Sequence, residues 1–344
     1  MNSEPNKVYV IGAGASHGAR DQDPPPLGCN LHHYVRKYLL KAWTELDILE
    51  EPADGSRTDN KRNYLKCELA KASSYESLVG ELSDSNPDLL QKLNLLMAYA
   101  LMPPRPPSMG DPIGDPKVDD AFKENLDLYD IWLEKILESD SCHKVSFVSL
   151  NYDCLLERAI CRSLGEQPEE GSCLCKSVNY RLDEQDSGFE VLKPHGSINW
   201  VHDERDYGVP LTRGSAIPLD QIDAMGRMSW ANIKAVNSPK GHEDIIIAHY
   251  APGKEAQANP GTLQKIRDLA LERIRKASFV KIVGVHIPPA SNDDPFLDSF
   301  MNLLSHRAKT NSCQIHYISP DDGDLQRASK LGFSASKMKF SDMV

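Results

Sequence analysis

The sequence predicts an α/β fold with a doubly wound, mostly parallel sheet and a helical insertion. Short runs of β-branched and aromatic residues alternate with stretches whose apolar residues recur at helical spacing. This alternation is typical of a parallel sheet covered by helices on both faces. Ligands of such open sheets bind at the carboxyl ends of the strands. We therefore expect the functional site where the apolar runs end.

The first element is a strand at residues 8–11, which runs into Gly-Ala-Gly-Ala-Ser at 12–16. Glycines allow a sharp turn and a close approach to a pyrophosphate, and the helix that follows would stabilise its charge. The ordinary dinucleotide-binding fingerprint has a third glycine where this chain has His17. A turn that only packs tightly is therefore the alternative interpretation.

The next part of the chain is helical in pattern. Residues 27–43 have apolar side chains at helical spacing, and so do most of residues 45–140, which a Pro-rich segment at 103–116 interrupts. We interpret 45–140 as a helical insertion or subdomain. Residues 1–44 and 141–344 then form the domain that carries the sheet.

The later strands lead into polar residues. The strand at 145–150 runs into Asn151 and a helix at 152–164, and the strand at 190–193 runs into His195. Together with the first strand, they predict a Rossmann-like, doubly wound sheet. The remaining expected strands cover 245–247, 279–285 and 314–318, and the expected helices between them cover 262–277 and 294–306.

Composition and charge exclude several classes of protein. The chain has 344 residues and a formal net charge of −11, which opposes binding to a phosphate backbone, so we expect no direct nucleic-acid binding. No apolar run approaches the ~18 residues that a membrane span needs. The N-terminus lacks the basic segment and apolar core of a signal peptide. We therefore expect a cytoplasmic protein without membrane contact.

The cysteines fit that compartment as free thiols. No C-x-x-C pair occurs, and only one close pair, Cys-Leu-Cys at 173–175, is present. No second pair follows it at the spacing of a zinc module, so we expect no metal. The eight cysteines are Cys29, Cys67, Cys142, Cys154, Cys161, Cys173, Cys175 and Cys313.

Five further positions stand at or near predicted strand ends. Asn151 and Asp153 lie where a strand runs into a helix, and both residue types commonly cap helix N-termini. His195 lies between a strand end and a glycine, and an imidazole can act as a general base near neutral pH. A structural role is the alternative for each of the three. Gly284 and Ser319 follow two later strands, where the adenosine half of a dinucleotide could lie.

The order of these motifs resembles the sirtuin superfamily. Gly-Ala-Gly-x-Ser is followed by Asn-Tyr-Asp and then by Lys-Pro-His-Gly-Ser-Ile-Asn-Trp. The last two are especially similar to the prokaryotic sirtuin-like domains of anti-phage defence systems. No motif covers the helical segment at 45–140. The resemblance extends over residues 7–18, 27–39, 145–159, 191–200 and 280–320.

The resemblance implies that NAD+ is the substrate, and it assigns roles to the matching residues. Asn151 and His195 would be catalytic, Asn151 by holding the nicotinamide ribose and placing water, His195 as base or ribose anchor. Asp153 would contact the nicotinamide carboxamide, and Gly284 would approach the adenosine ribose. The other cofactor-binding residues would be Gly12, Ala13, Gly14, Ser16 and Ser319.

Two departures from deacylating sirtuins bear on the reaction. Deacylating sirtuins carry the paired C-x-x-C motifs of a zinc module after His-Gly, whereas only Cys313 follows His195 here. Their Gly-Ile-Pro-Asp-Phe-Arg stretch has no match at residues 17–23. We therefore expect an NAD+ hydrolase (NAD glycohydrolase) that yields nicotinamide and ADP-ribose. The alternatives are a sirtuin-type NAD-dependent deacylase or ADP-ribosyltransferase, and a non-catalytic NAD- or ADP-ribose-binding regulatory module.

The resemblance to defence effectors also implies partners. An effector that depletes cellular NAD+ has to be restrained in resting cells, because NAD+ loss is toxic. Such effectors are held in oligomers or beside a sensor, and no sensor domain is recognisable in this sequence. We therefore expect a homo-oligomer, and a separate sensor or ATPase protein as a partner. The basic residues of the helix at 262–277 we interpret as a solvent-exposed face.

Overall fold

The computed structural model describes the segments that contain the sequence motifs, together with several helices between them. The statements below concern the described residues. The Pro-rich segment at 103–116 lies outside them. The described residues are 7–19, 26–27, 30–37, 58–73, 75–86, 89–90, 93–94, 96–97, 101, 128–139, 145–163, 178–181, 188–202, 214–216, 245–247, 260–288 and 295–344.

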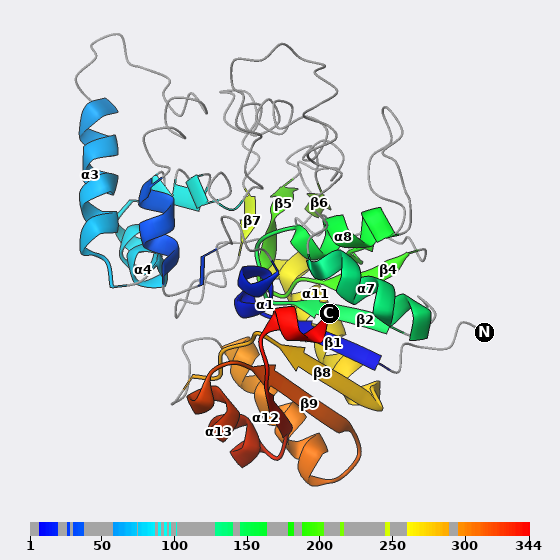
Figure 1. The fold of residues 1–344 in the computed structure, drawn as a ribbon. Helices are drawn as coiled ribbons and strands as arrows, with labels where there is room; N and C mark the ends of the chain where they lie inside the picture. Colours follow the sequence, from blue (N-terminus) through cyan, green and yellow to red (C-terminus); the bar gives the residue numbers. More distant parts are fainter. Residues whose placement is uncertain are drawn as a thin grey trace.

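A seven-stranded sheet forms the centre of the molecule, in the order β10-β9-β8-β1-β2-β4-β3 (Figure 1). Every strand pairing in it is parallel. From β1 the sheet extends first toward β2 and later toward β8, which confirms the predicted doubly wound α/β fold. The strands are β1 (Lys7–Ile11), β2 (Val145–Ser149), β3 (Val178–Asn179), β4 (Phe189–Leu192), β8 (Phe279–Val283), β9 (Gln314–Ser319) and β10 (Ser334–Lys337).

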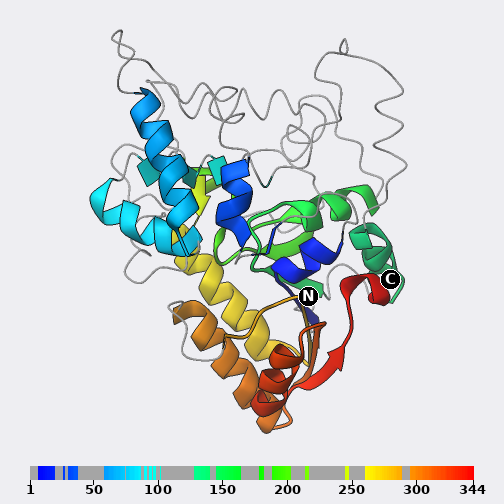
Figure 2. The ribbon, with the colours of Figure 1, turned by 60° about the vertical axis from the view of Figure 1, so that its left-hand side comes forward.

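Helices cover both faces of this sheet (Figures 1 and 2). One group contains α1 (Ala13–Gly18), α7 (Leu128–Ser139), α8 (Leu155–Ser163) and the short 3-10 helix η3 (Phe340–Met343), which contact one another. The other group contains α11 (Pro260–Lys276), α12 (Pro295–Lys309) and α13 (Asp322–Leu331), in which α12 contacts both neighbours. This is the two-sided cover that the alternation of strands and helices predicts.

The central strand is buried on both sides, as expected for the middle of a parallel sheet. Val8, Val10 and Ile11 are 0% exposed. Removing an aliphatic side chain of this size from water contributes roughly 1.5–3 kcal/mol. On the α7 side, Tyr9 meets Trp132 edge to face, with ring centroids 5.5 Å apart. Helix α7 therefore packs directly onto β1.

That contact bears on the expected division of the chain. Helix α7 belongs to the residues assigned to the helical insertion, yet it packs against β1, α8 and η3. Helices α3 (Thr58–Lys71) and α4 (Tyr75–Ser85), from the same segment, lie together to one side of the sheet (Figure 1). The boundary near residue 140 stays a prediction, and α7 lies with the sheet.

A second, antiparallel sheet in the order β6-β5-β7 was not predicted as a unit. Its strands are β5 (Gly196–His202), β6 (Gly214–Ala216) and β7 (Ile245–Ile247), of which only β7 was expected as a strand. β5 begins at the residue after His195, so the motif residues are themselves the start of a strand. The chain that follows His195 is therefore held by the pairing of β5 with β7 in the second sheet.

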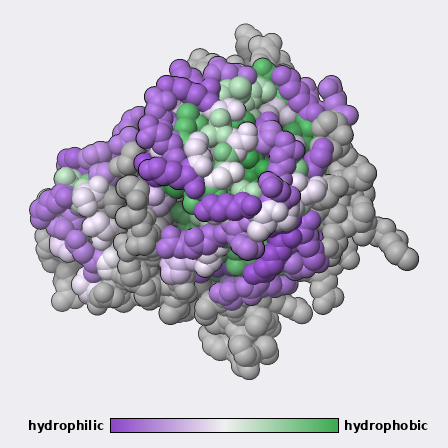
Figure 3. All heavy atoms as spheres, turned by 90° about the horizontal axis from the view of Figure 1, so that it is seen from below, coloured by the Kyte–Doolittle hydropathy of each residue, from purple (hydrophilic) through white to green (hydrophobic). Residues whose placement is uncertain are grey.

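The outer surface near α12 and α13 is shown from below in Figure 3, where hydrophilic residues surround a patch of more hydrophobic ones. The apolar residues of these two helices that reach the surface are half-buried: Leu303, Ala308, Leu325 and Leu331.

Within the described ranges, Tyr64 is the large hydrophobic side chain that is exposed, at 48%. None of the helices in these ranges is long and apolar enough to cross a membrane.

Candidate functional site

The sequence-predicted site residues gather at one edge of the parallel sheet. β1 lies between β2 and β8, where the order of the sheet reverses, and ligands of open α/β sheets bind at such a point. Each residue lies at or just beyond the carboxyl end of a strand: Gly12, Ala13, Gly14 and Ser16 after β1, Asn151 and Asp153 after β2, His195 after β4, Gly284 after β8, and Ser319 as the last residue of β9.

The glycines allow the turn after β1 and the turn after β8 to lie in close contact. A Cβ on Gly12 would lie 2.4 Å from the carbonyl oxygen of Gly284, and a Cβ on Gly14 would lie 3.0 Å from the same oxygen. Gly284 has φ +64, and a Cβ there would lie 2.1 Å from the amide nitrogen of Ala15. The turn after β1 and the turn after β8 can therefore touch only as glycines.

Hydrogen bonds join the same two turns. The amide N–H of Gly12 donates to Val283 O, and that of Gly14 donates to Gly284 O, each at 2.9 Å. These two amides are thus paired within the protein. The tight-packing interpretation of the Gly-Ala-Gly sequence explains these contacts. Binding of a dinucleotide beside the turn stays a proposal.

Ser319 continues this contact on the side of β9. Gly284 N–H donates to Ile318 O at 3.2 Å, which places the two strand ends side by side. The Ser319 hydroxyl is buried and accepts a hydrogen bond from the amide of Asp321 at 3.2 Å. Gly284 and Ser319 thus form one half of the sheet edge, next to the turn after β1.

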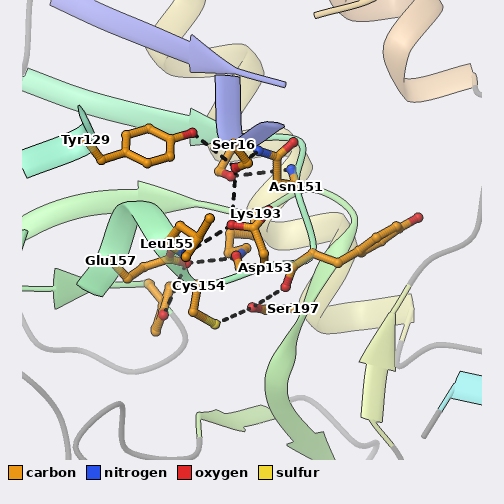
Figure 4. A network of polar contacts seen from close by, with 12 residues as sticks. Ser16, Tyr129, Asn151, Asp153, Cys154, Leu155, Glu157, Lys193 and Ser197 are labelled. Atoms are coloured by element: carbon orange, nitrogen blue, oxygen red, sulfur yellow. Dashed lines mark hydrogen bonds and ion pairs between the residues drawn. The ribbon is translucent and has the colours of Figure 1, made fainter. Parts of the chain in front are cut away.

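The other half of the edge is a network centred on the Ser16 hydroxyl (Figure 4). Asn151 Nδ2 donates to Ser16 Oγ at 2.8 Å, and Ser16 Oγ donates to Asp153 Oδ1 at 3.3 Å. The Tyr129 hydroxyl lies 3.2 Å from Ser16 Oγ. Because a hydroxyl has one hydrogen and Ser16 gives it to the carboxylate, Tyr129 is the donor in this contact. Ser16 therefore connects three side chains from distant parts of the sequence.

The same network fixes which end of the Asn151 amide faces the protein. Nδ2 also donates to the backbone oxygen of Gly12 at 3.1 Å, and a carbonyl oxygen can only accept. The reversed amide would place two oxygens against each other. Oδ1 is consequently the other end, and it is buried without a hydrogen-bond partner among the residues that the structure describes. An unpaired buried acceptor costs about 1–3 kcal/mol, so this atom suits a donor from a ligand.

Asp153 also shapes the start of α8. Its Oδ1 accepts the amide N–H of Leu155 at 3.1 Å as well as the Ser16 hydroxyl. The predicted helix at 152–164 begins instead at Leu155, because Asp153 forms the turn that precedes it. This bond supports the alternative interpretation of Asp153 as a residue that caps the helix start, and the same carboxylate also accepts the Ser16 hydroxyl.

His195 is joined to the residue just before Asn151. Its Nδ1 lies 3.4 Å from the backbone oxygen of Leu150, and the side chain is 1% exposed. Since the carbonyl oxygen accepts, the neutral ring carries its proton on Nδ1, and Nε2 is the nitrogen with the lone pair. The ring of Phe296, from α12, meets the imidazole edge to face at 5.8 Å. These contacts set both the tautomer and the plane of His195.

Two of the basic residues that we interpreted as solvent-exposed are in fact buried. Arg267 is 7% exposed and its Nε donates to Pro194 O at 3.1 Å, directly beside His195. Arg273 is 8% exposed and pairs with Glu190, whose carboxylate lies 2.7 Å from its Nε. Helix α11 therefore turns part of its positive charge inward, which amphipathic periodicity alone does not reveal.

The structure adds residues that the motifs did not assign. Lys193 Nζ lies 2.8 Å from Glu157 Oε1, with both side chains 0% exposed, and it also donates to Asp153 O. In the sequence, Lys193 stands out only as part of the His-Gly motif, and Glu157 only as part of a predicted helix. Tyr129 is 113 positions from Ser16, so no local signal in the sequence could reveal that contact.

Cys154 lies in the same cluster, with Sγ 3.6 Å from Ser197 Oγ. Burial raises the pKa of its thiol to about 12. The thiolate is the nucleophilic form of cysteine, so Cys154 stays a protonated, unreactive thiol at neutral pH. Within the described ranges, no group of three or more His, Cys, Asp or Glu side chains could hold a metal ion.

No protein-family model matches the sequence, and no curated protein matches it. Among solved structures, a Sir2 homologue in complex with NAD is similar at 12% identity and a TM-score of 0.47, over 98% of this chain and 86% of that chain. A structure on the mechanism and regulation of Sir2 enzymes gives 12% identity and 0.42, over 99% and 90%. A Sir2 homologue with a serine-to-alanine substitution, in complex with ADP-ribose, gives 12% and 0.40, over 99% and 89%. Likeness at this level establishes neither family nor function.

Proposed function

We propose that the chain is an NAD+ hydrolase that cleaves NAD+ to nicotinamide and ADP-ribose. The observation that carries the proposal is the fixed amide of Asn151, whose buried Oδ1 has no hydrogen-bond partner in the described part of the chain. His195, with Nε2 as its acceptor nitrogen, is bonded to the neighbouring Leu150 O. The two groups stand at adjacent strand ends of a sheet edge where dinucleotides bind in this fold class.

The chemistry requires positioning more than a reactive side chain. Cleavage of the bond between nicotinamide and ribose develops oxocarbenium character on the sugar, and water then takes the place of nicotinamide. In the proposal, Asn151 Oδ1 accepts a hydrogen bond from that water or from a ribose hydroxyl. His195 Nε2 accepts from the ribose hydroxyl or from the water. Pre-oriented polar groups of this kind lower a barrier because they do not reorganise during the reaction.

The remaining site residues would hold the rest of the substrate. Asp153 is proposed to contact the nicotinamide carboxamide, and Ala13 lies at the start of α1 beside the two paired glycine turns. Gly284 and Ser319 would lie near the adenosine ribose, since they form the β8–β9 side of the edge. Because the Ser16 hydroxyl already makes three hydrogen bonds, its proposed part is to orient Asn151 and Asp153.

The test is to follow nicotinamide and ADP-ribose from NAD+ with the purified protein, with and without an acylated peptide. Equal release of both products without peptide is the expected result. Release that requires the peptide would indicate the deacylase or ADP-ribosyltransferase alternative. Tight NAD+ binding without turnover would favour the regulatory module. Asn151→Ala and His195→Ala are each expected to lower kcat by about 10²–10³-fold.

The proposal extends to the biological role through the motif resemblance. The chain would be a cytoplasmic anti-phage effector that depletes cellular NAD+, held inactive as a homo-oligomer or by a separate sensor or ATPase protein. Light scattering of the purified protein tests the oligomer. Measuring cellular NAD+ after phage infection, in cells with the wild-type chain or with Asn151→Ala, tests the role. Equal NAD+ levels in both strains would contradict it.

A further inference from the structure

We propose that the buried ion pair of Lys193 and Glu157 is a positioning device that ties the Asn151–Asp153 turn to the His195 turn. The inference rests on the proposed function, because it assigns the pair to the geometry of that same site. Lys193 precedes His195 by two residues, and it bonds Asp153, which follows Asn151 by two. The pair thus joins the two segments that carry the proposed catalytic residues.

The contacts that carry the inference are all inside the protein. Lys193 Nζ lies 2.8 Å from Glu157 Oε1, and the exposed fraction of both side chains is 0%. The same Nζ donates to the backbone oxygen of Asp153. Tyr180 donates its hydroxyl to Glu157 Oε1 at 3.3 Å, which holds the carboxylate toward the lysine. Figure 4 shows Lys193 placed between Asp153 and Glu157.

A contribution to stability does not explain this arrangement. Burying a lysine and a glutamate removes both charges from water, and apolar residues of similar size are often as stabilising or more so. Burial favours a neutral lysine, but the combined effect of Glu157, Cys154 and Asp153 outweighs it, and the pKa of Lys193 is raised. Lys193 therefore stays charged, with hydrogens to donate to both oxygens. An apolar pair could not hold the Asp153 carbonyl.

The loop before His195 is held from the opposite side as well. Arg267 Nε, from α11, donates to Pro194 O at 3.1 Å. Glu157, from α8, and Arg267, from α11, thus hold two consecutive residues before His195, which are Lys193 and Pro194. Without the Lys193 bond, the Asp153 carbonyl loses this donor, and the turn that bears Asn151 and Asp153 is free to shift relative to His195.

The experiment compares the wild-type chain with the double variant Lys193→Met/Glu157→Leu, which removes both charges together and keeps similar volume. The control is Arg273→Met, which also deletes a buried ion pair but leaves Glu190 bonded to Arg181 and Ser146. Readouts are Tm, hydrogen exchange of the amides of residues 150–156, NAD+ affinity, and kcat separately from KM.

The expected result is a double variant with Tm close to wild type, at least tenfold faster exchange at 150–156, and kcat at least tenfold lower with KM within threefold. The control should leave exchange at 150–156 and kcat unchanged. Wild-type exchange and wild-type kcat in the folded double variant would overturn the inference. Should the double variant not fold, Glu157→Gln weakens the pair with its shape retained and is expected to change both readouts in the same direction. Wild-type values there would equally overturn it.

Hydrogen exchange needs no substrate, so it separates this inference from the proposed function. If the wild-type chain neither binds nor cleaves NAD+, the proposed function fails. Faster exchange at 150–156 in the double variant alone would then still support the tie between the two turns. Unchanged exchange would overturn that tie, whatever the activity of the wild-type chain.

Discussion

The side-chain amide of Asn151 donates from Nδ2 to the backbone oxygen of Gly12 at 3.1 Å, which joins the ends of β2 and β1. Because only a donor can face that oxygen, the amide has one orientation, and Oδ1 is the end that no described residue bonds. The backbone oxygen of Gly12 thus fixes the orientation of the side-chain amide of Asn151, the residue that we propose as catalytic.

The contact of Gly284 with the turn after β1 predicts a large loss of stability on substitution. Gly284→Ala puts a Cβ 2.1 Å from Ala15 N at φ +64, so both sterics and backbone conformation oppose it. We expect the free energy of unfolding to fall by at least ~2 kcal/mol, measured by urea unfolding. The matched control is Gly323→Ala in α13, where the nearest atoms are movable side-chain ends of Asp321 and Arg327. Equal stability of the two variants would contradict the packing argument.

Tyr129→Phe removes one hydroxyl from the network and leaves the ring in place. The ring packs against Phe340 at 4.9 Å and Trp132 at 6.2 Å, contacts that phenylalanine keeps. We expect a stability loss of about 1 kcal/mol. The kcat for NAD+ cleavage should also fall several-fold, because Ser16 loses a donor and its hold on Asn151 weakens.

The control for this substitution is Tyr75→Phe, which deletes a buried hydroxyl that donates to Leu93 O in the helical segment. It should lower stability by a similar amount and leave kcat unchanged. If Tyr129→Phe also kept wild-type kcat, the hydroxyl network around Ser16 would be structural only.

A pH-dependent contact lies beyond the end of β8. The hydrogen bond to Asp324 raises the pKa of His286, and His286 Nδ1 lies 3.0 Å from Asp324 Oδ1. A histidine with a raised pKa adds stability that is complete below its unfolded pKa of about 6.5 and disappears as pH rises through the folded value. Because the His286 side chain is 69% exposed, we expect only a few tenths of a kcal/mol.

This effect is measured as the difference in unfolding free energy between the wild-type chain and His286→Gln across pH. The difference should be constant below about pH 6 and should decline above about 6.5. Arg327, which also pairs with Asp324 at 2.6 Å, opposes the charge on His286 and keeps the effect small. A difference that grows with rising pH would contradict the assignment.

Much of the fold followed from local patterns in the sequence. The strands β1, β2, β8 and β9 are short runs rich in β-branched and aromatic residues, and such runs are typical of strands. β3 and β10 were missed because they are short or polar: β10 reads Ser-Ala-Ser-Lys and lies at the sheet edge. Helix α13 has recognisable start and stop residues in the sequence: Asp321 accepts Asp324 N–H at its start, and Gly332 has φ 92 after its end.

The sequence predicts which residues lie at the strand ends of the candidate site, but not which side chains hydrogen-bond to one another there. Strand ends and motif order placed Asn151, Asp153 and His195 at one edge, because parallel strands share their carboxyl ends. Strand ends and motif order do not predict individual hydrogen bonds. The contact of Tyr129 with Ser16, for example, depends on how α7 packs. Likewise, the sequence predicts glycines at the turn after β1, but only the facing turn at Gly284 explains them by contact.

The measurement that tests the central claim most directly is NAD+ cleavage by Asn151→Asp, an isosteric change that puts an oxygen against Gly12 O. The control is Asn179→Asp, a buried asparagine outside the site whose Oδ1 accepts Arg181 N–H in either form. We expect the wild-type chain and the control to release nicotinamide and ADP-ribose equally. Folded Asn151→Asp should be slower by two orders of magnitude or more. Turnover at the wild-type rate by Asn151→Asp would contradict the assignment of Asn151 and, with it, this account of the site.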